Sequence, residues 1–266
     1  MNPFRQLLQN TPGRAPIGSW LMSASPIVCE AMGCAGFEWG VVDMEHTPLD
    51  QMEIVHMLQA LAGTPLVPVV RVPWNERVMI KRVLDAGAST LLVPFVQDAE
   101  EARAAVAATR YPPAGCRGLA AMSRASRFGT LPNYVAKAND RVCVIVQLET
   151  AEAIDRVDAI AQVEGVEALF VGPGDLSATM GLAGQPMHPD VLALTAHAIA
   201  RAKALGRPIG TVGGTPEVVQ HYLSMGFDFV AVASDLSLMM RAAQAALGAL
   251  GVTAQVKPAT PAQSAY

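Results

Sequence analysis

Short apolar runs alternate with segments of helical periodicity along nearly the whole chain. The clearest example has apolar runs at Val142–Leu148 and Ala168–Val171, with Ile, Val and Ala recurring at helical spacing through Ala151–Val163 between them. This order predicts a strand, a helix and a second strand. A right-handed crossover of this kind makes the two strands parallel. Parallel strands are buried on both faces, which explains why the apolar runs are continuous instead of alternating. The stretch therefore predicts a βαβ unit.

The same alternation extends through the sequence and predicts eight strands and eight helices of a (β/α)8 TIM barrel, an α/β fold. The predicted strands are Ala15–Leu21, Glu38–Val42, Leu66–Val72, Thr90–Val93, Val142–Leu148, Ala168–Val171, Pro208–Val212 and Phe227–Ala233. The predicted helices are Pro26–Cys34, Asp50–Leu61, Glu76–Leu84, Asp98–Thr109, Ala151–Val163, Pro189–Leu205, Pro216–Met225 and Asp235–Leu250. A doubly wound open sheet is disfavoured, since no GxGxxG follows the first strand. We expect one domain over 1–250 and a mobile tail over 251–266.

One long connection, Arg110–Asn139, interrupts this rhythm with several Gly and Pro residues. Connections of this length are typical of a lid or a binding loop. Arg117, Arg124 and Arg127 lie within it. These arginines either recognise a distal carboxylate or are solvated surface residues.

Composition and charge exclude several classes of protein. Hydrophobic residues make up 52% of the chain and charged residues 16%, which permits a large core and argues against global disorder. The net charge of −4 and the absence of a Lys/Arg run argue against a nucleic-acid partner. No apolar run approaches the ~20 residues of a membrane span, and the first residues lack a signal-peptide core, so we expect a cytoplasmic protein. Without a CxxC pair, the cysteines are expected to be reduced core residues: Cys29, Cys34, Cys116 and Cys143.

Two carboxylates follow the strands of the central βαβ unit, Glu149 after the first and Asp175 after the second. Parallel strands present their carboxyl ends at one edge of a sheet, where α/β enzymes place their chemistry. The pair is consistent with a divalent metal site, with an acid–base pair, or with helix N-caps at Thr150 and Asp175. The run Gly172–Gly174 favours a site, because glycine lets backbone N–H groups approach an anion closely.

Polar residues also follow other predicted strands, and in a barrel all of them converge on one face. They are Asp43, Glu45, His46, Arg71, Gln147, Glu149, Asp175, Ser234 and Asp235. An acid cluster for a metal, an Arg for a developing oxyanion and a His for proton transfer form a coherent set. Taken singly, Arg71 is also consistent with a structural ion pair, and His46 with a helix-capping or hydrogen-bonded loop residue.

The lysines argue against covalent imine chemistry. None of them falls within a predicted strand: they are Lys81, Lys137, Lys203 and Lys257. A Schiff-base aldolase needs a desolvated Lys inside the barrel mouth. Carbonyl activation is therefore expected to come from a metal ion.

Four segments together resemble the class II, metal-dependent pyruvate aldolases, including those that act on 4-hydroxy-2-oxoheptanedioate and on 2-dehydro-3-deoxy sugar acids. These segments are Gly36–Asp50, Pro68–Asn75, Thr109–Gly118 and Gln147–Gly181. The resemblance implies a barrel enzyme, usually hexameric, that cleaves a 4-hydroxy-2-oxo acid to pyruvate and an aldehyde. Alternatives are a sugar-acid aldolase, a related metal-enolate lyase or oxaloacetate decarboxylase, and a non-catalytic binding barrel.

The resemblance also implies roles for particular residues. Glu149 and Asp175 would hold Mg²⁺, Mn²⁺ or Co²⁺, and Arg71 would stabilise the pyruvate enolate. His46 with Asp43 would be the proton-transfer dyad. The substrate-binding residues would be Trp20, Gln147, Gly174, Asp175 and Val212, with the backbone of Gly174 and Asp175 holding the pyruvate carboxylate.

Two departures from the family pattern bear on these roles. Gly174 stands where the family has Ala, a change that we expect to be tolerated. The segment Gly210–Gly214 is smaller than its family counterpart, and that region contacts the aldehyde. The resemblance therefore defines the pyruvate half of the substrate better than the aldehyde half.

The last predicted helix, Asp235–Leu250, is apolar around more than one face. An outer barrel helix needs only one buried stripe, so the second face is expected to meet another subunit. The alternative is an exposed, merely Ala-rich helix. The resemblance favours the first reading, because these aldolases exchange or pack their C-terminal helices across a dimer. We therefore expect a homo-oligomer, with a hexamer as the family's usual form.

Overall fold

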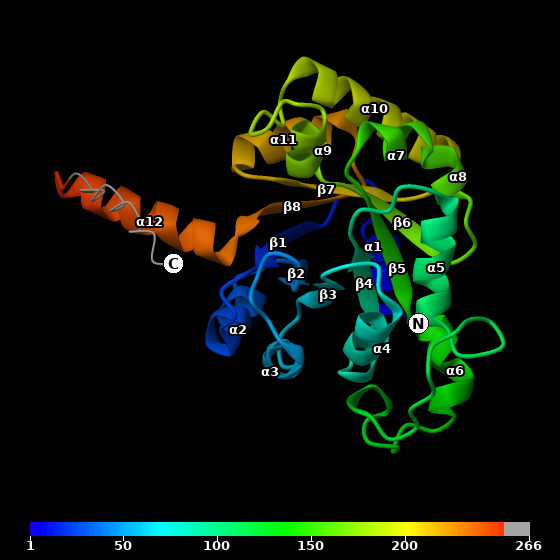
Figure 1. The fold of residues 1–266 in the computed structure, drawn as a ribbon. Helices are drawn as coiled ribbons and strands as arrows, with labels where there is room; N and C mark the ends of the chain where they lie inside the picture. Colours follow the sequence, from blue (N-terminus) through cyan, green and yellow to red (C-terminus); the bar gives the residue numbers. More distant parts are fainter. Residues whose placement is uncertain (253–266) are drawn as a thin grey trace, which may run out of the picture.

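A computed structural model describes residues 1–252, in which eight parallel strands close into a barrel in chain order (Figure 1). Each strand pairs with the next in sequence, and the last pairs with the first. This confirms the predicted (β/α)8 fold. The strands are β1 (Ile17–Leu21), β2 (Trp39–Asp43), β3 (Val67–Arg71), β4 (Thr90–Val93), β5 (Cys143–Leu148), β6 (Val166–Val171), β7 (Ile209–Gly213) and β8 (Phe229–Ser234).

The eight predicted helices are all present in the predicted order, and α1 (Pro3–Asn10) before the first strand and α9 (Pro173–Thr179) after β6 add to them. The predicted helix Ala151–Val163 is divided at Arg156, and a short helix at Tyr134–Arg141 was not predicted. The α-helices are α1 (Pro3–Asn10), α2 (Pro26–Cys34), α3 (Gln51–Leu61), α4 (Arg77–Asp85), α5 (Ala99–Thr109), α6 (Tyr134–Arg141), α7 (Ala151–Asp155), α8 (Val157–Ala161), α9 (Pro173–Thr179), α10 (Pro189–Ala204), α11 (Pro216–Met225) and α12 (Asp235–Ala249).

Local capping explains where several helices begin. Asp50 accepts hydrogen bonds from the first turn of α3 and forms a reciprocal capping box with Glu53. Asp98 and Thr150 also cap α5 and α7 by accepting first-turn backbone N–H groups, without a capping box. Two helices predicted to start at Asp50 and Asp98 therefore start one residue later, because the first residue of each prediction is its cap.

Side chains fill the barrel interior, so the barrel is not a pore. The interior contains an aromatic cluster whose rings meet mostly edge to face: Phe4, Trp20, Trp39, Phe170 and Phe229. Glycines make room for these rings: a Cβ on Gly18 would lie 2.4 Å from Trp39, and one on Gly210 would lie 2.2 Å from Phe229. The small residue at 210 is thus required by the neighbouring ring.

The connection Arg110–Asn139 lies at the end of the barrel opposite the strand C-termini, which corrects the prediction of a lid or substrate loop. Arg117 pairs with Asp85 at the end of α4 (Nη2–Oδ1, 2.7 Å), and Arg124 donates to a carbonyl of the α4–β4 connection. Arg127 is exposed. Because this segment joins the end of α5 to the start of β5, it must lie where strands begin. Figure 1 shows it as green loops beside α4 and α6.

The cysteines are free thiols, as expected, but only half of them are core residues. Cys29 and Cys143 are buried, whereas Cys34 and Cys116 are exposed. Burial raises the pKa of Cys29 to about 12, which keeps this thiol protonated and unreactive at neutral pH. The prediction that all four are buried is therefore wrong for Cys34 and Cys116.

The final helix, α12, departs from the barrel instead of packing along it (Figure 1). Asp235 is its one buried residue. Its exposed apolar side chains are Leu236, Met239, Met240 and Leu247. In residues 1–252 no helix is long and apolar enough to span a bilayer. The predicted mobile tail 251–266 falls, from residue 253 onward, outside the described residues.

Candidate active site

A pocket of about 260 Å³ opens at the C-terminal ends of the strands. Its lining divides into two parts. One part carries charged and amide side chains from β3, β5 and the start of α9: Arg71, Gln147, Glu149 and Asp175. The other part is neutral and comes from β1 and the residue after it, from β7 and from β8: Trp20, Met22, Val212, Ala233 and Ser234. Of the predicted site residues, Trp20, Arg71, Gln147, Glu149, Gly174, Asp175 and Val212 all line this pocket.

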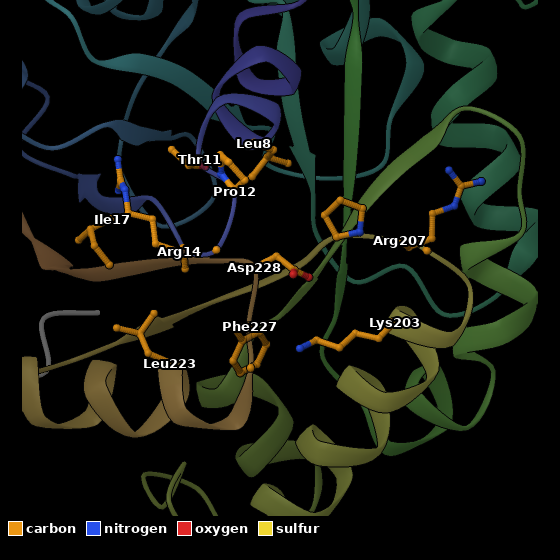
Figure 2. Close-up of a pocket in the computed structure, with 15 residues that line it drawn as sticks. Leu8, Thr11, Pro12, Arg14, Ile17, Lys203, Arg207, Leu223, Phe227 and Asp228 are labelled. Atoms are coloured by element: carbon orange, nitrogen blue, oxygen red, sulfur yellow. The ribbon is translucent and has the colours of Figure 1, made fainter.

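A larger cavity of about 920 Å³ lies at the opposite end of the barrel (Figure 2). Its lining comes from the segment before β1 and from the connections that lead into β7 and β8. Its polar groups serve the fold: Arg14 makes a two-point ion pair with Glu38, and Asp228 accepts the backbone N–H of Ile209. Lys203 also lines this cavity, but it is an exposed residue of α10. The smaller pocket is the one with converging chemistry.

Arg71 is held rigidly beside the pocket by two carboxylates. Its Nε and Nη2 donate to the two oxygens of Asp43 at 2.8 and 2.7 Å, and its Nη1 lies 2.7 Å from Oε2 of Glu45. Asp43 and Arg71 are direct neighbours in the register of β2 and β3, which explains the pairing. Arg71 is 6% exposed, and its guanidinium also lies over the ring of Trp20. An arginine has five N–H donors, so at least two remain for a ligand beside the hydrogen bonds to Asp43 and the ion pair with Glu45.

The structure does not bring His46 and Asp43 together as the predicted dyad requires. Both oxygens of Asp43 bind Arg71, and one of them also accepts the backbone N–H of Glu45. The acidic neighbour of His46 is instead Glu45, at 3.8 Å from Nε2, and the His46 side chain is 55% exposed. Burial raises the pKa of Glu45, and Arg71 opposes this shift. The sequence placed Glu45 at the strand end but gave no indication of its contacts.

Glu149 is a buried carboxylate, 1% exposed, just beyond the end of β5. The backbone N–H of Phe95 donates to its Oε2 at 2.9 Å, and Nε2 of Gln147 donates to its Oε1 at 3.0 Å. Burial raises the pKa of Glu149 to about 8, and the negative charges of Glu45 and Asp175 contribute to this shift. The Phe95 hydrogen bond opposes it. A cation bound here would favour the ionised form.

Asp175 is the third residue of α9, so the alternative prediction that it caps a helix is wrong. The N-cap position belongs to Gly172, and Thr150 does cap α7, as that alternative expected. Gly174 has open space where a Cβ would point, which agrees with the expectation that Ala is tolerated there. Asp175 is thereby left half-buried in the pocket lining, available to a ligand.

The residues of the charged part fit a hard divalent cation. Among the described residues, no three His, Cys, Asp or Glu side chains converge as a complete metal cage. Glu149 and Asp175 provide two carboxylates, and Oε1 of Gln147 is a buried acceptor with no hydrogen-bond partner in the described part of the chain. Mg²⁺-like ions commonly use one or two carboxylates and complete their shell with water and substrate oxygens.

Comparisons with known proteins agree with this architecture. The chain is 54% identical to a 2-dehydro-3,6-dideoxy-6-sulfogluconate aldolase of Pseudomonas putida, over 89% of this chain and 92% of the relative. It is 47% identical to a 4-hydroxy-2-oxo-heptane-1,7-dioate aldolase of Shigella sonnei, over 97% and 98%. A crystal structure of an HpcH/HpaI aldolase/citrate lyase family protein from Burkholderia cenocepacia superposes with a TM-score of 0.91 at 39% identity, covering 94% of this chain and all of that one. The family model matches residues 16–242, and the chain therefore belongs to the HpcH/HpaI aldolase/citrate lyase family and is a lyase.

Proposed function

We propose that this protein cleaves 4-hydroxy-2-oxo acids to pyruvate and an aldehyde, and catalyses the reverse aldol addition, with a divalent metal ion as cofactor. One observation carries the proposal: Arg71, Glu149 and Asp175 line a single pocket at the barrel mouth. The neutral wall of the same pocket consists of Trp20, Met22, Val212, Ala233 and Ser234. The charged part suits the 2-oxo acid, and the neutral part suits the aldehyde. Both relatives named above are aldolases of 2-oxo acids, which supports the reaction class.

Glu149 and Asp175 would hold the metal, with Mg²⁺, Mn²⁺ and Co²⁺ as the candidate ions. A divalent ion at this position supplies Lewis-acid polarisation of the 2-oxo group. Glu149 is already oriented for this role by the Phe95 N–H and the Gln147 amide. Such outer contacts fix a ligand before the metal binds.

Arg71 would stabilise the charge that develops on the 2-oxo oxygen. When the C3–C4 bond breaks, its electron pair moves into the pyruvate fragment, which becomes an enolate. The two N–H donors of Arg71 that do not engage Asp43 or Glu45 are available to this oxygen. The first-turn N–H groups of α9, at Gly174 and Asp175, have no acceptor within the helix and would bind the pyruvate carboxylate.

His46 would receive the proton of the C4 hydroxyl through a water molecule, so that the C4–O bond becomes the aldehyde carbonyl. The protonated His46 would then return this proton through the same water to C3 of the enolate, which leaves as pyruvate. In this structure Glu45, not Asp43, lies beside His46, so Glu45 is the better candidate to orient the imidazole. Asp43 instead orients Arg71.

The proposal includes two candidate substrates, which differ in the aldehyde that they release. Succinic semialdehyde is the product expected from 4-hydroxy-2-oxoheptanedioate. A 2-dehydro-3-deoxy sugar acid is the second candidate substrate, favoured by the 54% identity to the sulfogluconate aldolase. The two candidates share the 2-oxo acid end and differ at the aldehyde end, which the neutral wall would contact.

The test is pyruvate release by Mn²⁺-loaded protein from a panel of both substrate types, followed with a coupled lactate dehydrogenase assay. Protein treated with EDTA is the control. Oxaloacetate decarboxylation, measured at saturating substrate, separates aldol cleavage from a metal-enolate decarboxylase. Absence of pyruvate release from every 4-hydroxy-2-oxo acid would contradict the proposed reaction.

We further propose that the protein is a homo-oligomer in which α12 packs against a second copy, with a hexamer as the family precedent. The exposed apolar side chains of α12, such as Met239 at 57% exposed, support this arrangement, because isolated apolar helices are rarely left in water. Light scattering that shows a monomer at micromolar concentration would contradict it. The free, exposed thiols of Cys34 and Cys116 are consistent with a cytoplasmic setting.

A further inference from the structure

Beside the neutral wall of the pocket lies a buried carboxylate that has no part in the proposed reaction. Asp235, 4% exposed, is the first residue of α12. Its Oδ1 accepts the backbone N–H groups of Met22 (2.9 Å) and Leu236 (2.8 Å), and its Oδ2 accepts the N–H of Ser23 (3.1 Å). One side chain therefore binds the segments that follow β1 and β8.

These contacts lie where the barrel seam ends. Trp20 and Ser234 are the last residues paired between β1 and β8, and Asp235 continues the connection beyond them. Ala24 and Ala233 flank this junction with positive φ angles of 55° and 56°. Non-glycine residues rarely adopt this conformation, and it persists only where the surroundings fix it. The surrounding contacts therefore hold the backbone of Ala24 and Ala233 in a conformation that alanine does not favour.

We propose that Asp235 is a positioning residue that sets the pocket wall formed by Trp20, Met22, Ala233 and Ser234, and that it ties this wall to α12. The inference rests on the proposed function, in which this wall receives the aldehyde. None of the atoms that Asp235 binds belongs to the charged part of the pocket. Loss of the Asp235 contacts should therefore loosen the neutral wall and weaken aldehyde binding, while pyruvate activation stays intact.

Asp235→Asn is the informative variant, because it keeps the size of the side chain. An amide can accept with its oxygen only, so its NH₂ group must face a backbone N–H that the carboxylate formerly accepted. Asp228→Asn is the matched control. Asp228 lies just before the other end of β8, accepts the backbone N–H of Ile209 at 2.9 Å and lines the larger cavity at the opposite end of the barrel (Figure 2).

Two measurements test the proposal on the metal-loaded, full-length protein. Hydrogen exchange followed by mass spectrometry should show the Met22 and Ser23 amides exchanging at least about tenfold faster in the Asp235 variant, and unchanged in the Asp228 variant. Kinetics in the synthetic direction should show an aldehyde KM raised about tenfold in the Asp235 variant, with exchange of pyruvate methyl protons in D₂O within about twofold of wild type.

The outcomes distinguish a failure of the positioning role of Asp235 from a failure of the proposed aldolase function. Unchanged amide exchange in the Asp235 variant would overturn the positioning role, as would an aldehyde KM that moves no more than in the Asp228 control. Equal losses of aldehyde binding and of pyruvate proton exchange would also overturn it, since they indicate general damage. A wild-type protein with neither aldol activity nor pyruvate exchange would instead contradict the proposed function, while the exchange data would still decide whether Asp235 holds the wall.

Discussion

Replacing Gly172 by Ala tests how closely the metal site depends on one missing side chain. The backbone at Gly172 has φ −91° and ψ 92°, which alanine can adopt. A Cβ there would lie 2.3 Å from Oε1 of Glu149 and 2.7 Å from its Cγ. The substitution therefore acts by steric contact alone, on a carboxylate that is already buried.

The size of the effect follows from these distances. The two atoms must separate by about 1 Å to reach ordinary van der Waals contact. Moving the carboxylate that far would stretch the 2.9 Å bond from Phe95 N–H beyond hydrogen-bonding range. Loss of such an outer contact typically lowers metal affinity by about 10- to 100-fold, equivalent to about 1.4–2.7 kcal/mol. We expect Gly172→Ala to fall in this range for Mn²⁺.

Calorimetric titration with Mn²⁺ measures this change, and circular dichroism checks that the barrel is folded. Gly174→Ala is the control, two residues away, because nothing lies within 4 Å of the position its Cβ would take. It should bind Mn²⁺ like the wild type. If Gly172→Ala and Gly174→Ala both bind Mn²⁺ within about twofold of wild type, Glu149 is not the ligand that the geometry indicates.

Three further predictions concern the charged part of the pocket. Glu149→Gln and Asp175→Asn should each lose metal affinity by more than about tenfold while remaining folded, because charge is removed with little change in volume; unchanged affinity in both, by calorimetry, would move the metal elsewhere. Burial raises the pKa of Glu149 to about 8, so metal binding below that pH must displace a proton. The apparent Mn²⁺ affinity should therefore rise about tenfold per pH unit from pH 6 towards 8 and then level off. A flat profile would argue against Glu149 as a metal ligand. Arg71→Lys should reduce kcat/KM by more than about 100-fold, since an ammonium cannot replace the planar fork that binds Asp43; near wild-type turnover would remove Arg71 from the mechanism.

The sequence was sufficient to place Arg71, Glu149 and Asp175 in one pocket, because that inference needs only the chain direction. Parallel strands deliver whatever follows their carboxyl ends to the same face. The error over Arg110–Asn139 came from treating the length of a connection as the signal. The segment leads from a helix into β5, and topology alone assigns it to the opposite face.

Other features depend on tertiary contacts that a sequence pattern does not record. Asp43 and Glu45 are both near His46 in sequence, but the β2–β3 register gives Asp43 to Arg71 and leaves Glu45 beside the imidazole. Helix α6 was missed because it buries only Tyr134 and Ala138, four residues apart, among polar residues. A single buried pair gives too weak a periodicity to detect.

The aromatic cluster inside the barrel affects how the chain folds during synthesis. Phe4 precedes every strand, yet its ring packs against Trp39 and against Phe229 near the other end of the sequence. Contacts that span so much of the chain are slow to form, because the intervening loop must first be closed. Helix α1 is therefore made before every strand of the barrel but is among the last elements to find its place, after β8 has left the ribosome. Until then its apolar face is exposed, and the nascent chain is open to chaperones and to aggregation.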